Sequence, residues 1–213
     1  FIERAIFIAG ILSIVFVVLI FIFLLKEGLS LFRTYPPASF LFGFKWYPIS
    51  TPPHFGILPL LLGSLAVTVG AILISVPLGL AAAIYIAEVA PLWLRETLKT
   101  TVEFLAAIPS IVLGFIGLVT LAPLVKKIFH LPTGLTALSG SIMLAFMAMP
   151  TIVSMIEDAF NAVPKSYREG ALALGATKWQ TIWRVVLPAA SSGMLAAVML
   201  GVGRVIGETM AVM

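Results

Sequence analysis

The amino-acid sequence predicts an all-α fold that crosses a membrane several times. Of its 213 residues, 61% are hydrophobic and 10% are charged, whereas a soluble domain carries about 25% charged residues. The apolar residues also form stretches long enough to cross a bilayer, which takes about 20 residues per helix. This composition excludes a soluble globular enzyme, a disordered tail and a nucleic-acid-binding arm. The sequence contains no cysteine, which excludes disulfides and thiolate metal sites.

Five stretches are long and apolar enough to be spanning helices. They run over Ala5–Leu25, Ile57–Ala87, Val102–Val125, Ala137–Ile156 and from Pro188 to Met213. The chain accordingly divides into a first transmembrane helix at 1–25, an outer lobe at 26–56 and a core at 57–213. Because the fifth stretch is still apolar at Met213, we expect a sixth spanning helix beyond it. Pro77, Pro109 and Pro150 lie inside three of the stretches and predict kinks.

A polar segment at 157–187 separates the fourth and fifth stretches. Ser166 and Glu169 have the spacing of a capping box, so a short helix is expected at 166–174. Gly175 follows this helix, where glycine readily adopts the left-handed conformation that ends helices. Thr177 and Gln180 repeat the capping pattern and predict a second helix.

The second helix of this segment should be amphipathic. Trp179, Ile182, Trp183 and Val186 follow the i, i+3, i+4, i+7 spacing and predict one apolar stripe at the membrane interface. Pro188 then suits the first position of the fifth spanning helix. The spacing fits two interpretations equally well. The first helix of the segment can fit into a groove of another protein, or both helices form an ordinary interfacial helix-turn-helix.

The segment Glu169–Pro188 resembles the EAA loop of permease subunits in binding-protein-dependent ABC importers. The family pattern is E-A-A, three residues, G, nine residues, then I-x-L-P. This chain has Glu169-Gly170-Ala171, Gly175 and Val185-Val186-Leu187-Pro188 in the same register, with Gly170 and Val185 as the two departures. The resemblance implies a cytoplasmic loop that docks on an ATPase subunit, through Ser166, Glu169, Gly170, Ala171, Leu174 and Gly175. It settles the orientation, which the seven-to-five division of Lys and Arg between alternate loops leaves open.

Three further segments are similar to the permeases of phosphate-specific transporters, in particular the PstC type. They are Phe55–Glu88, Ala106–Leu118 and Gly201–Val212. This resemblance implies the transmembrane domain of a type I ABC importer (MetI-like) in the inner or plasma membrane. It implies three kinds of partner: a second permease of the PstA type, two ATP-binding subunits of the PstB type, and a periplasmic or lipoprotein phosphate-binding protein. We expect no cofactor and no metal site in this chain.

Arg204 and Glu208 are ionisable residues inside the fifth stretch, where an arginine costs about 2.5–3.5 kcal/mol on insertion scales. At 100° per residue both share a face with Gly193, Ala197 and Gly201, so they are expected to point into the helix bundle. They are four residues apart and can form an ion pair. The pair either locks the packing or gates and contacts an anion on the transport path, since a guanidinium donates two parallel hydrogen bonds to an oxyanion.

We therefore predict a permease subunit for ATP-driven import of inorganic phosphate. Another oxyanion, sulfate or molybdate, is the alternative substrate. An ion-coupled secondary carrier is a further alternative, although it does not need an ATPase-facing loop. The sequence has no His-Glu-x-x-His and no Gly-x-Ser-x-Gly motif of the kind an intramembrane enzyme uses. It also has no phosphate-binding loop motif, so ATP hydrolysis is assigned to a partner.

Overall fold

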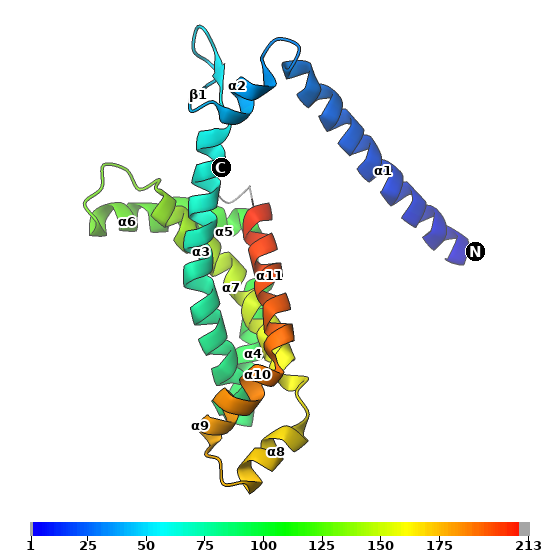
Figure 1. Cartoon of the computed structure of the whole chain (residues 1–213), viewed down its shortest axis with the longest axis vertical. Coiled ribbons are helices and arrows are strands. Elements are labelled where there is room, and N and C mark those ends of the chain that lie inside the picture. The colour runs from blue at the N-terminus through cyan, green and yellow to red at the C-terminus, as the bar shows by residue number, and fades with distance from the viewer. Residues whose placement is uncertain (1, 209–213) are drawn as a thin grey trace. The chain divides into compact units, whose positions relative to one another are not determined.

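A computed structural model of the chain describes residues 2–208, which are mostly helical (Figure 1). The chain divides into two compact units, Phe1–Leu62 and Gly63–Met213. The described residues contain four helices long and apolar enough to cross a membrane, or five if one bent helix pair counts as a single span. The predicted continuation of the fifth helix through 209–213, and the sixth helix expected after it, lie outside the described residues.

The first unit contains one long helix and a small lobe. Helix α1 (Ile2–Leu31) has no buried residue. After α2 (Pro37–Phe42), strands β1 (Trp46–Tyr47) and β2 (His54–Phe55) pair antiparallel, with Trp46 opposite Phe55. The Phe55 ring makes edge-to-face contacts with Tyr35 and Trp46 at centroid distances of 5.6 and 6.2 Å, so the residues after α1 form an ordered aromatic lobe.

Three long helices form the core of the second unit. Helix α3 (Leu58–Ile84) continues through Pro77 without a break in its helical residues and ends in the π-helix η1 (Tyr85–Val89). Helix α7 (Ala137–Asn161) packs against both α3 and α11 (Ser191–Gly207). Ile152 of α7 lies between Gly79 of α3 and Gly201 of α11, where any added Cβ would collide with its side chain. The three helices therefore pack closely because α3 and α11 carry small residues where they meet α7.

The third predicted span is divided in the structure. Helix α4 (Leu92–Ala107) ends at Ile108, and the chain then forms α5 (Ser110–Ile116), the π-helix η2 (Gly117–Leu121) and α6 (Ala122–Ile128). The expected single helix over Val102–Val125 is wrong because Pro109 disfavours a helical conformation at the preceding residue, and Ile108 is extended with ψ 128°. The spanning helix of this region runs over Ser110–Ile128.

The polar segment forms α8 (Lys165–Ala173), α9 (Lys178–Thr181), the π-helix η3 (Ile182–Val186) and α10 (Leu187–Ala189). The last three make one continuous helical piece, which is bent by 69° from α11. No helix begins at Pro188, so the start expected there is wrong: the bent pair begins at Lys178, and α11 begins at Ser191 after the bend. Pro188 lies in α10, before Ala190, where the chain bends.

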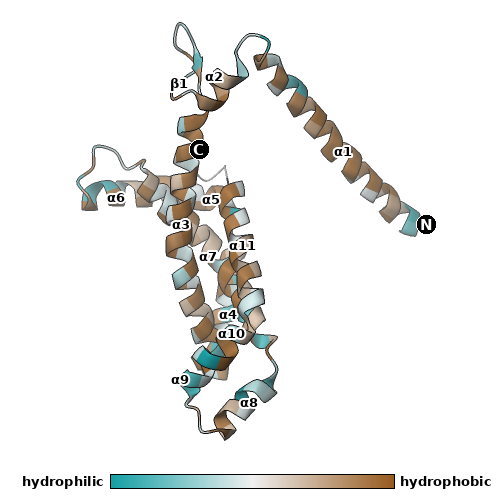
Figure 2. Ribbon diagram, viewed as in Figure 1, coloured by the Kyte–Doolittle hydropathy of each residue, from teal (hydrophilic) through white to brown (hydrophobic). Residues whose placement is uncertain are grey.

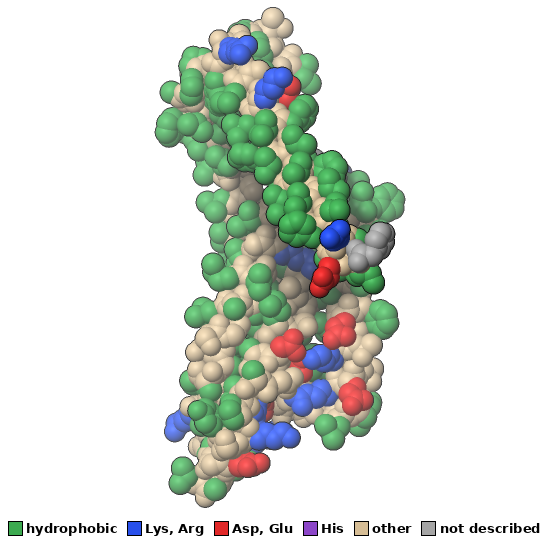
Figure 3. All heavy atoms as spheres, turned by 90° about the vertical axis from the view of Figure 1, so that its right-hand side faces the viewer, with side chains coloured by type: hydrophobic (Ala, Val, Ile, Leu, Met, Phe, Trp, Pro, Cys, Tyr) green, Lys and Arg blue, Asp and Glu red, His purple; other side chains and the backbone are tan. Residues whose placement is uncertain are grey.

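Polar residues concentrate at one end of the second unit. Figure 2 shows hydrophilic residues along α8 and α9, whereas the residues of α3 and α11 are largely hydrophobic. In the space-filling view, Lys, Arg, Asp and Glu side chains gather at the lower end, which carries α8 and α9 (Figure 3). This distribution fits a helix bundle surrounded by lipid along its length, with one polar end in water.

Candidate functional site: the α8 loop and the charged residue of α11

Helix α8 carries the predicted docking residues, but it begins differently from the prediction. Pro164 is the N-cap, with extended backbone, and no side chain caps the helix. Ser166 therefore lies inside the first turn, and the predicted Ser166–Glu169 capping box is wrong because Pro164 starts the helix earlier. Glu169 and Gly170 are exposed, and Ala171 is half-buried. Leu174, the residue after the helix, is 91% exposed, so α8 presents both a carboxylate and an apolar side chain to its surroundings.

The end of α8 has the predicted glycine cap. Gly175 has φ +83°, a conformation that costs glycine little and other residues more. Its N–H donates to the Leu172 carbonyl at 3.0 Å, and the Ala176 N–H donates to the Ala171 carbonyl at 3.1 Å. These two bonds form a Schellman motif, which fixes the direction in which the chain leaves α8.

The helix that follows begins with the predicted capping box. The Thr177 N–H donates to Gln180 Oε1 at 2.9 Å, and the Gln180 N–H donates to Thr177 Oγ1 at 3.2 Å. The predicted apolar stripe, however, divides into two faces. Its members Ile182 and Val186 are buried in the core. Its members Trp179 and Trp183 are exposed, with ring centroids 5.8 Å apart.

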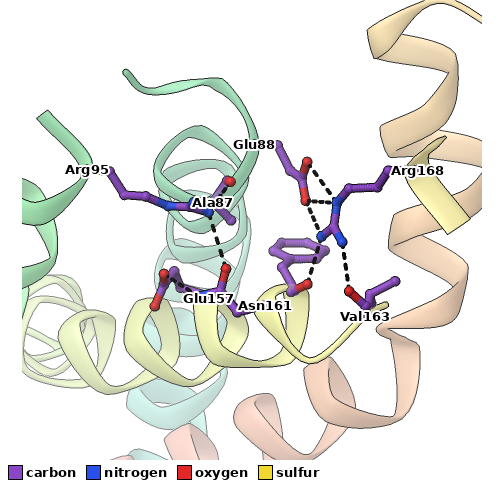
Figure 4. Close-up of polar contacts among 8 residues, drawn as sticks. Ala87, Glu88, Arg95, Glu157, Asn161, Val163 and Arg168 are labelled. Carbon is purple, nitrogen blue, oxygen red and sulfur yellow. Dashed lines mark hydrogen bonds and ion pairs between the residues drawn. The ribbon is translucent and has the colours of Figure 1, made fainter. Parts of the chain in front are cut away.

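Arg168 of α8 connects three elements of the second unit (Figure 4). Its Nε and Nη2 donate to Glu88 Oε1 of η1 at 3.1 and 2.6 Å. Its Nη2 also donates to the Phe160 carbonyl of α7, and its Nη1 to the Val163 carbonyl just after α7, both at 2.8 Å. The Glu88 side chain is 10% exposed and that of Arg168 is 22% exposed. Sequence reasoning missed this cluster because its two charges are 80 positions apart.

A second set of charges joins α4 to α7. Lys99 Nζ contacts Glu157 Oε2 at 2.7 Å and Asp158 Oδ1 at 3.1 Å, and the Glu157 residue is 3% exposed. The hydrogen bond to Glu157 raises the pKa of Lys99 above its ordinary value, against the opposing effect of burial. Arg95 of α4 donates to the Ala87 carbonyl and, at 3.2 Å, to Asn161. Together with Arg168, these side chains tie η1, α4 and α8 to the last turns of α7.

Arg204 of α11 faces the bundle, as predicted. Its Nη1 donates to Thr151 Oγ1 of α7 at 2.6 Å. Ala197 and Gly201 on the same helix are buried, and a Cβ at Gly201 would lie 2.5 Å from Ile152 Cγ1. The opposite face exposes large hydrophobic residues, including Leu195, Met199 and Ile206. Val205 is buried at 4% exposure.

Glu208 does not form the expected ion pair with Arg204 among the residues that the structure describes. Helix α11 ends at Gly207, and Glu208 is its C-cap with φ −87° and ψ 69°. The i, i+4 contact requires helical backbone through both residues, and Glu208 is not helical. The described partner of the guanidinium is therefore the neutral Thr151 hydroxyl.

Comparison with known proteins identifies the family. A family model described as "Binding-protein-dependent transport system inner membrane component" matches residues 75–213. The chain belongs to this family. It is 45% identical, over 92% of its length, to the "Probable ABC transporter permease protein YqgH" of Bacillus subtilis (strain 168), of which it covers 64%. It is 36% identical, over 82% of its length, to the phosphate transport system permease protein PstC of Xylella fastidiosa (strain Temecula1), of which it covers 59%.

A solved structure shows the same architecture. A chain of the MetNI methionine ABC transporter, in a structure titled for its inward-facing conformations, matches with a TM-score of 0.56 and 25% identity, over 72% of this chain and 69% of that one. The predicted MetI-like all-α fold and the multi-pass membrane location are thus confirmed, as is the resemblance to PstC-type permeases. The chain spans less than two thirds of the length of the YqgH and PstC relatives.

Proposed function

We propose that this chain is a permease subunit for ATP-driven import of inorganic phosphate. The observation that carries the proposal is a guanidinium inside a spanning helix, Arg204, that faces the bundle and is held by a neutral hydroxyl. An ionisable group at such a position is usually functional, because insertion makes it costly. Relatives named phosphate transport permeases support the choice of phosphate.

The contact between Arg204 and Thr151 suits an anion that must bind and leave. The Thr151 hydroxyl accepts one hydrogen bond from Arg204 and carries no charge, so it does not neutralise the guanidinium and the positive charge stays available to an incoming oxyanion. Phosphate can then take two parallel hydrogen bonds from the planar fork, which a hydroxyl cannot match. Glu208, at the end of α11, is the proposed second gate residue. Its carboxylate repels phosphate and would assist release when it approaches the path.

Helix α8 is the proposed docking site for an ATP-binding subunit. Glu169 is exposed on it and Leu174 is exposed just after it, as a surface that enters another protein's groove requires. The Schellman turn at Gly175 would hold the docked helix at a fixed angle to α9. The remaining docking residues of the proposal are Ser166, Gly170 and Ala171. The complete transporter would contain a second permease, two ATP-binding subunits and a phosphate-binding protein.

Uptake of radiolabelled phosphate by cells that express the complete transporter tests the substrate. We expect sulfate and molybdate to compete poorly, and Arg204→Gln to abolish uptake while the complex still assembles. Lys127→Gln, which removes a charge from the exposed end of α6, serves as the control. Strong competition by sulfate or molybdate would assign the other oxyanion, and unchanged uptake in Arg204→Gln would refute the role of Arg204.

Co-purification tests the docking surface separately. An ATP-binding subunit should be recovered with the wild-type chain and lost with Glu169→Arg, because the change reverses an exposed charge on α8. Uptake that needs no ATP-binding subunit would favour the ion-coupled carrier instead.

A further inference from the structure

We propose that Arg168 is the positioning residue that makes α8 move as one body with the ends of α3 and α7. The inference rests on the proposed docking of an ATP-binding subunit on α8. The backbone already connects the docked helix to α11, through Gly175 and α9. In the proposed role, Arg168 adds a second connection, made by its side chain, from α8 directly to the core.

The first support is the number of groups that a single side chain holds. Arg168 bonds the Glu88 carboxylate through two nitrogens and also donates to the Phe160 and Val163 carbonyls. Carbonyls at a helix C-terminus have no partner within the helix and carry partial negative charge. The guanidinium therefore caps the end of α7 while it pairs with η1, and few of its donors are left for water.

The second support is where these contacts lie along the core helices. Glu88 belongs to η1, which continues α3 directly, and π-helical turns often occur at functional positions. Phe160 is fully buried in the last turn of α7. The same helix carries Thr151, the partner of Arg204. A displacement of α8 that is passed to α7 by Arg168 would therefore reach the helix that holds the proposed anion contact.

The third support is that the rest of α8 is held loosely. Its residues Glu169, Gly170 and Leu172 are exposed, and no residue of the helix is buried. A helix with so little buried surface would pivot on its connecting loops when a partner pulled on it. The partly buried Arg168 cluster resists such pivoting, because separating it would leave the Glu88 carboxylate without its guanidinium partner and would remove one donor from each of two carbonyls.

The chemistry makes arginine specific for this position. Lysine keeps the charge but has a single nitrogen and cannot bond a carboxylate bidentately while also reaching two carbonyls. Arg168→Lys should thus retain part of the connection and Arg168→Gln almost none. Exchanging the charges, Arg168→Glu with Glu88→Arg, restores the ion pair but not the carbonyl bonds, and should recover part of the loss of either single change. Arg184→Gln is the matched control, since Arg184 is an exposed basic residue in the same loop.

The first experiment measures the movement itself in the reconstituted complete transporter. The chain has no native cysteine, so spin labels at Ala173→Cys on α8 and Leu78→Cys on α3 report one distance, with and without a non-hydrolysable ATP analogue. We expect one narrow distance distribution in the chain that carries only the two labels and in the labelled Arg184→Gln variant, both with and without the ATP analogue. Arg168→Gln should broaden or shift the distribution when the analogue is added. An unchanged distribution in Arg168→Gln would overturn the proposal.

The second experiment measures phosphate transported per ATP hydrolysed in proteoliposomes. For Arg168→Gln we expect this ratio to fall roughly tenfold or more, the scale of losing a charge-assisted hydrogen bond, while the ATP-binding subunit stays bound. Arg168→Lys should lie between Arg168→Gln and wild type, and an unchanged ratio in Arg168→Gln also overturns the proposal. If the wild-type complex binds ATP-binding subunits but transports no phosphate, only the proposed substrate is contradicted. The distance measurement then still decides the role of Arg168.

Discussion

Adding one methyl group at Gly201 should weaken the packing of α11 on α7. A Cβ built at this position lies 2.5 Å from Ile152 Cγ1 and 2.7 Å from its Cδ1, whereas ordinary contact begins at 3.4 Å. Ile152 cannot move away freely, because it is 1% exposed and a Cβ at Gly79, on α3, would meet its Cγ2 at 2.9 Å. The backbones of α11 and α7 must therefore separate in the variant Gly201→Ala.

The expected magnitude follows from two opposing effects. Overpacking a well-filled core costs about 1–3 kcal/mol, while replacing glycine by alanine inside a helix gains up to about 1 kcal/mol. Gly203→Ala isolates the second effect, because Gly203 lies on the same helix and a Cβ there meets nothing within 4 Å. The two variants should differ in unfolding free energy by roughly 1–3 kcal/mol, with Gly201→Ala the less stable.

Thermal unfolding of the purified chain in detergent measures this difference. At about 2–4 °C per kcal/mol for a chain of this size, the midpoints of the two variants should lie roughly 2–12 °C apart. Ile152→Ala, which removes the colliding atoms, should make Gly201→Ala nearly neutral, although Ile152→Ala itself costs about 2–5 kcal/mol. A Gly201→Ala chain at least as stable as Gly203→Ala would refute the close packing of α11 on α7.

Three other predictions concern the polar end of the second unit. The hydrogen bond to Glu157 is the main cause that raises the pKa of Lys99 above 10.5. The stability that Lys99 contributes should therefore be complete below pH 10.5 and lost as pH rises through its higher folded-state pKa. The unfolding free energies of wild type and Lys99→Gln, measured across this pH range, should converge at high pH. Gly170→Ala should stabilise α8, where a Cβ meets nothing, whereas Gly175→Ala should destabilise the chain by about 1 kcal/mol or more at its left-handed position; the opposite order of melting temperatures would contradict the cap. Thr177→Ala should cost about 0.5–2 kcal/mol by removing the capping box, measured as a lower melting temperature with Thr177→Ser as the conservative control.

The features that sequence reasoning predicted correctly are local ones. The Gly175 turn and the Thr177–Gln180 capping box depend on residues within a few positions of one another, and their hydrogen bonds form as the spacing indicates. The inward orientation of Arg204 was also predictable, since the small residues of α11 mark the face that packs against another helix. Periodicity along one helix contains enough information for each of these.

The errors arose where a neighbouring residue changed a local rule. Pro164 starts α8 two positions before Ser166 and removes the need for the predicted serine cap. Pro109 was expected to kink a span, but it ends α4 and separates it from α5. Glu208 was treated as helical, whereas α11 ends one residue before it. In each case the apolar pattern located the element, and backbone geometry at one residue decided where the element began or ended.

The connections between distant segments could not be predicted from one sequence. Arg168 and Glu88 are each unremarkable charged residues near an end of an apolar stretch, and nothing in their spacing along the chain brings them together. Their pairing depends on α8 returning toward the end of α3, which the hydrophobic pattern does not specify. Burial provides the missing signal, since a carboxylate that is 10% exposed requires a partner.

Helix α7 joins the two parts of the proposed mechanism. Near its middle, Thr151 holds Arg204 and Ile152 separates Gly79 from Gly201. At its end, the Phe160 carbonyl accepts from Arg168. The side chains between these points are largely buried, and a closely packed helix transmits a displacement instead of absorbing it. Among the described hydrogen bonds and ion pairs, none joins α8 directly to α11. A movement that begins at α8 and reaches the end of α7 should nevertheless change the contact between Thr151 and Arg204.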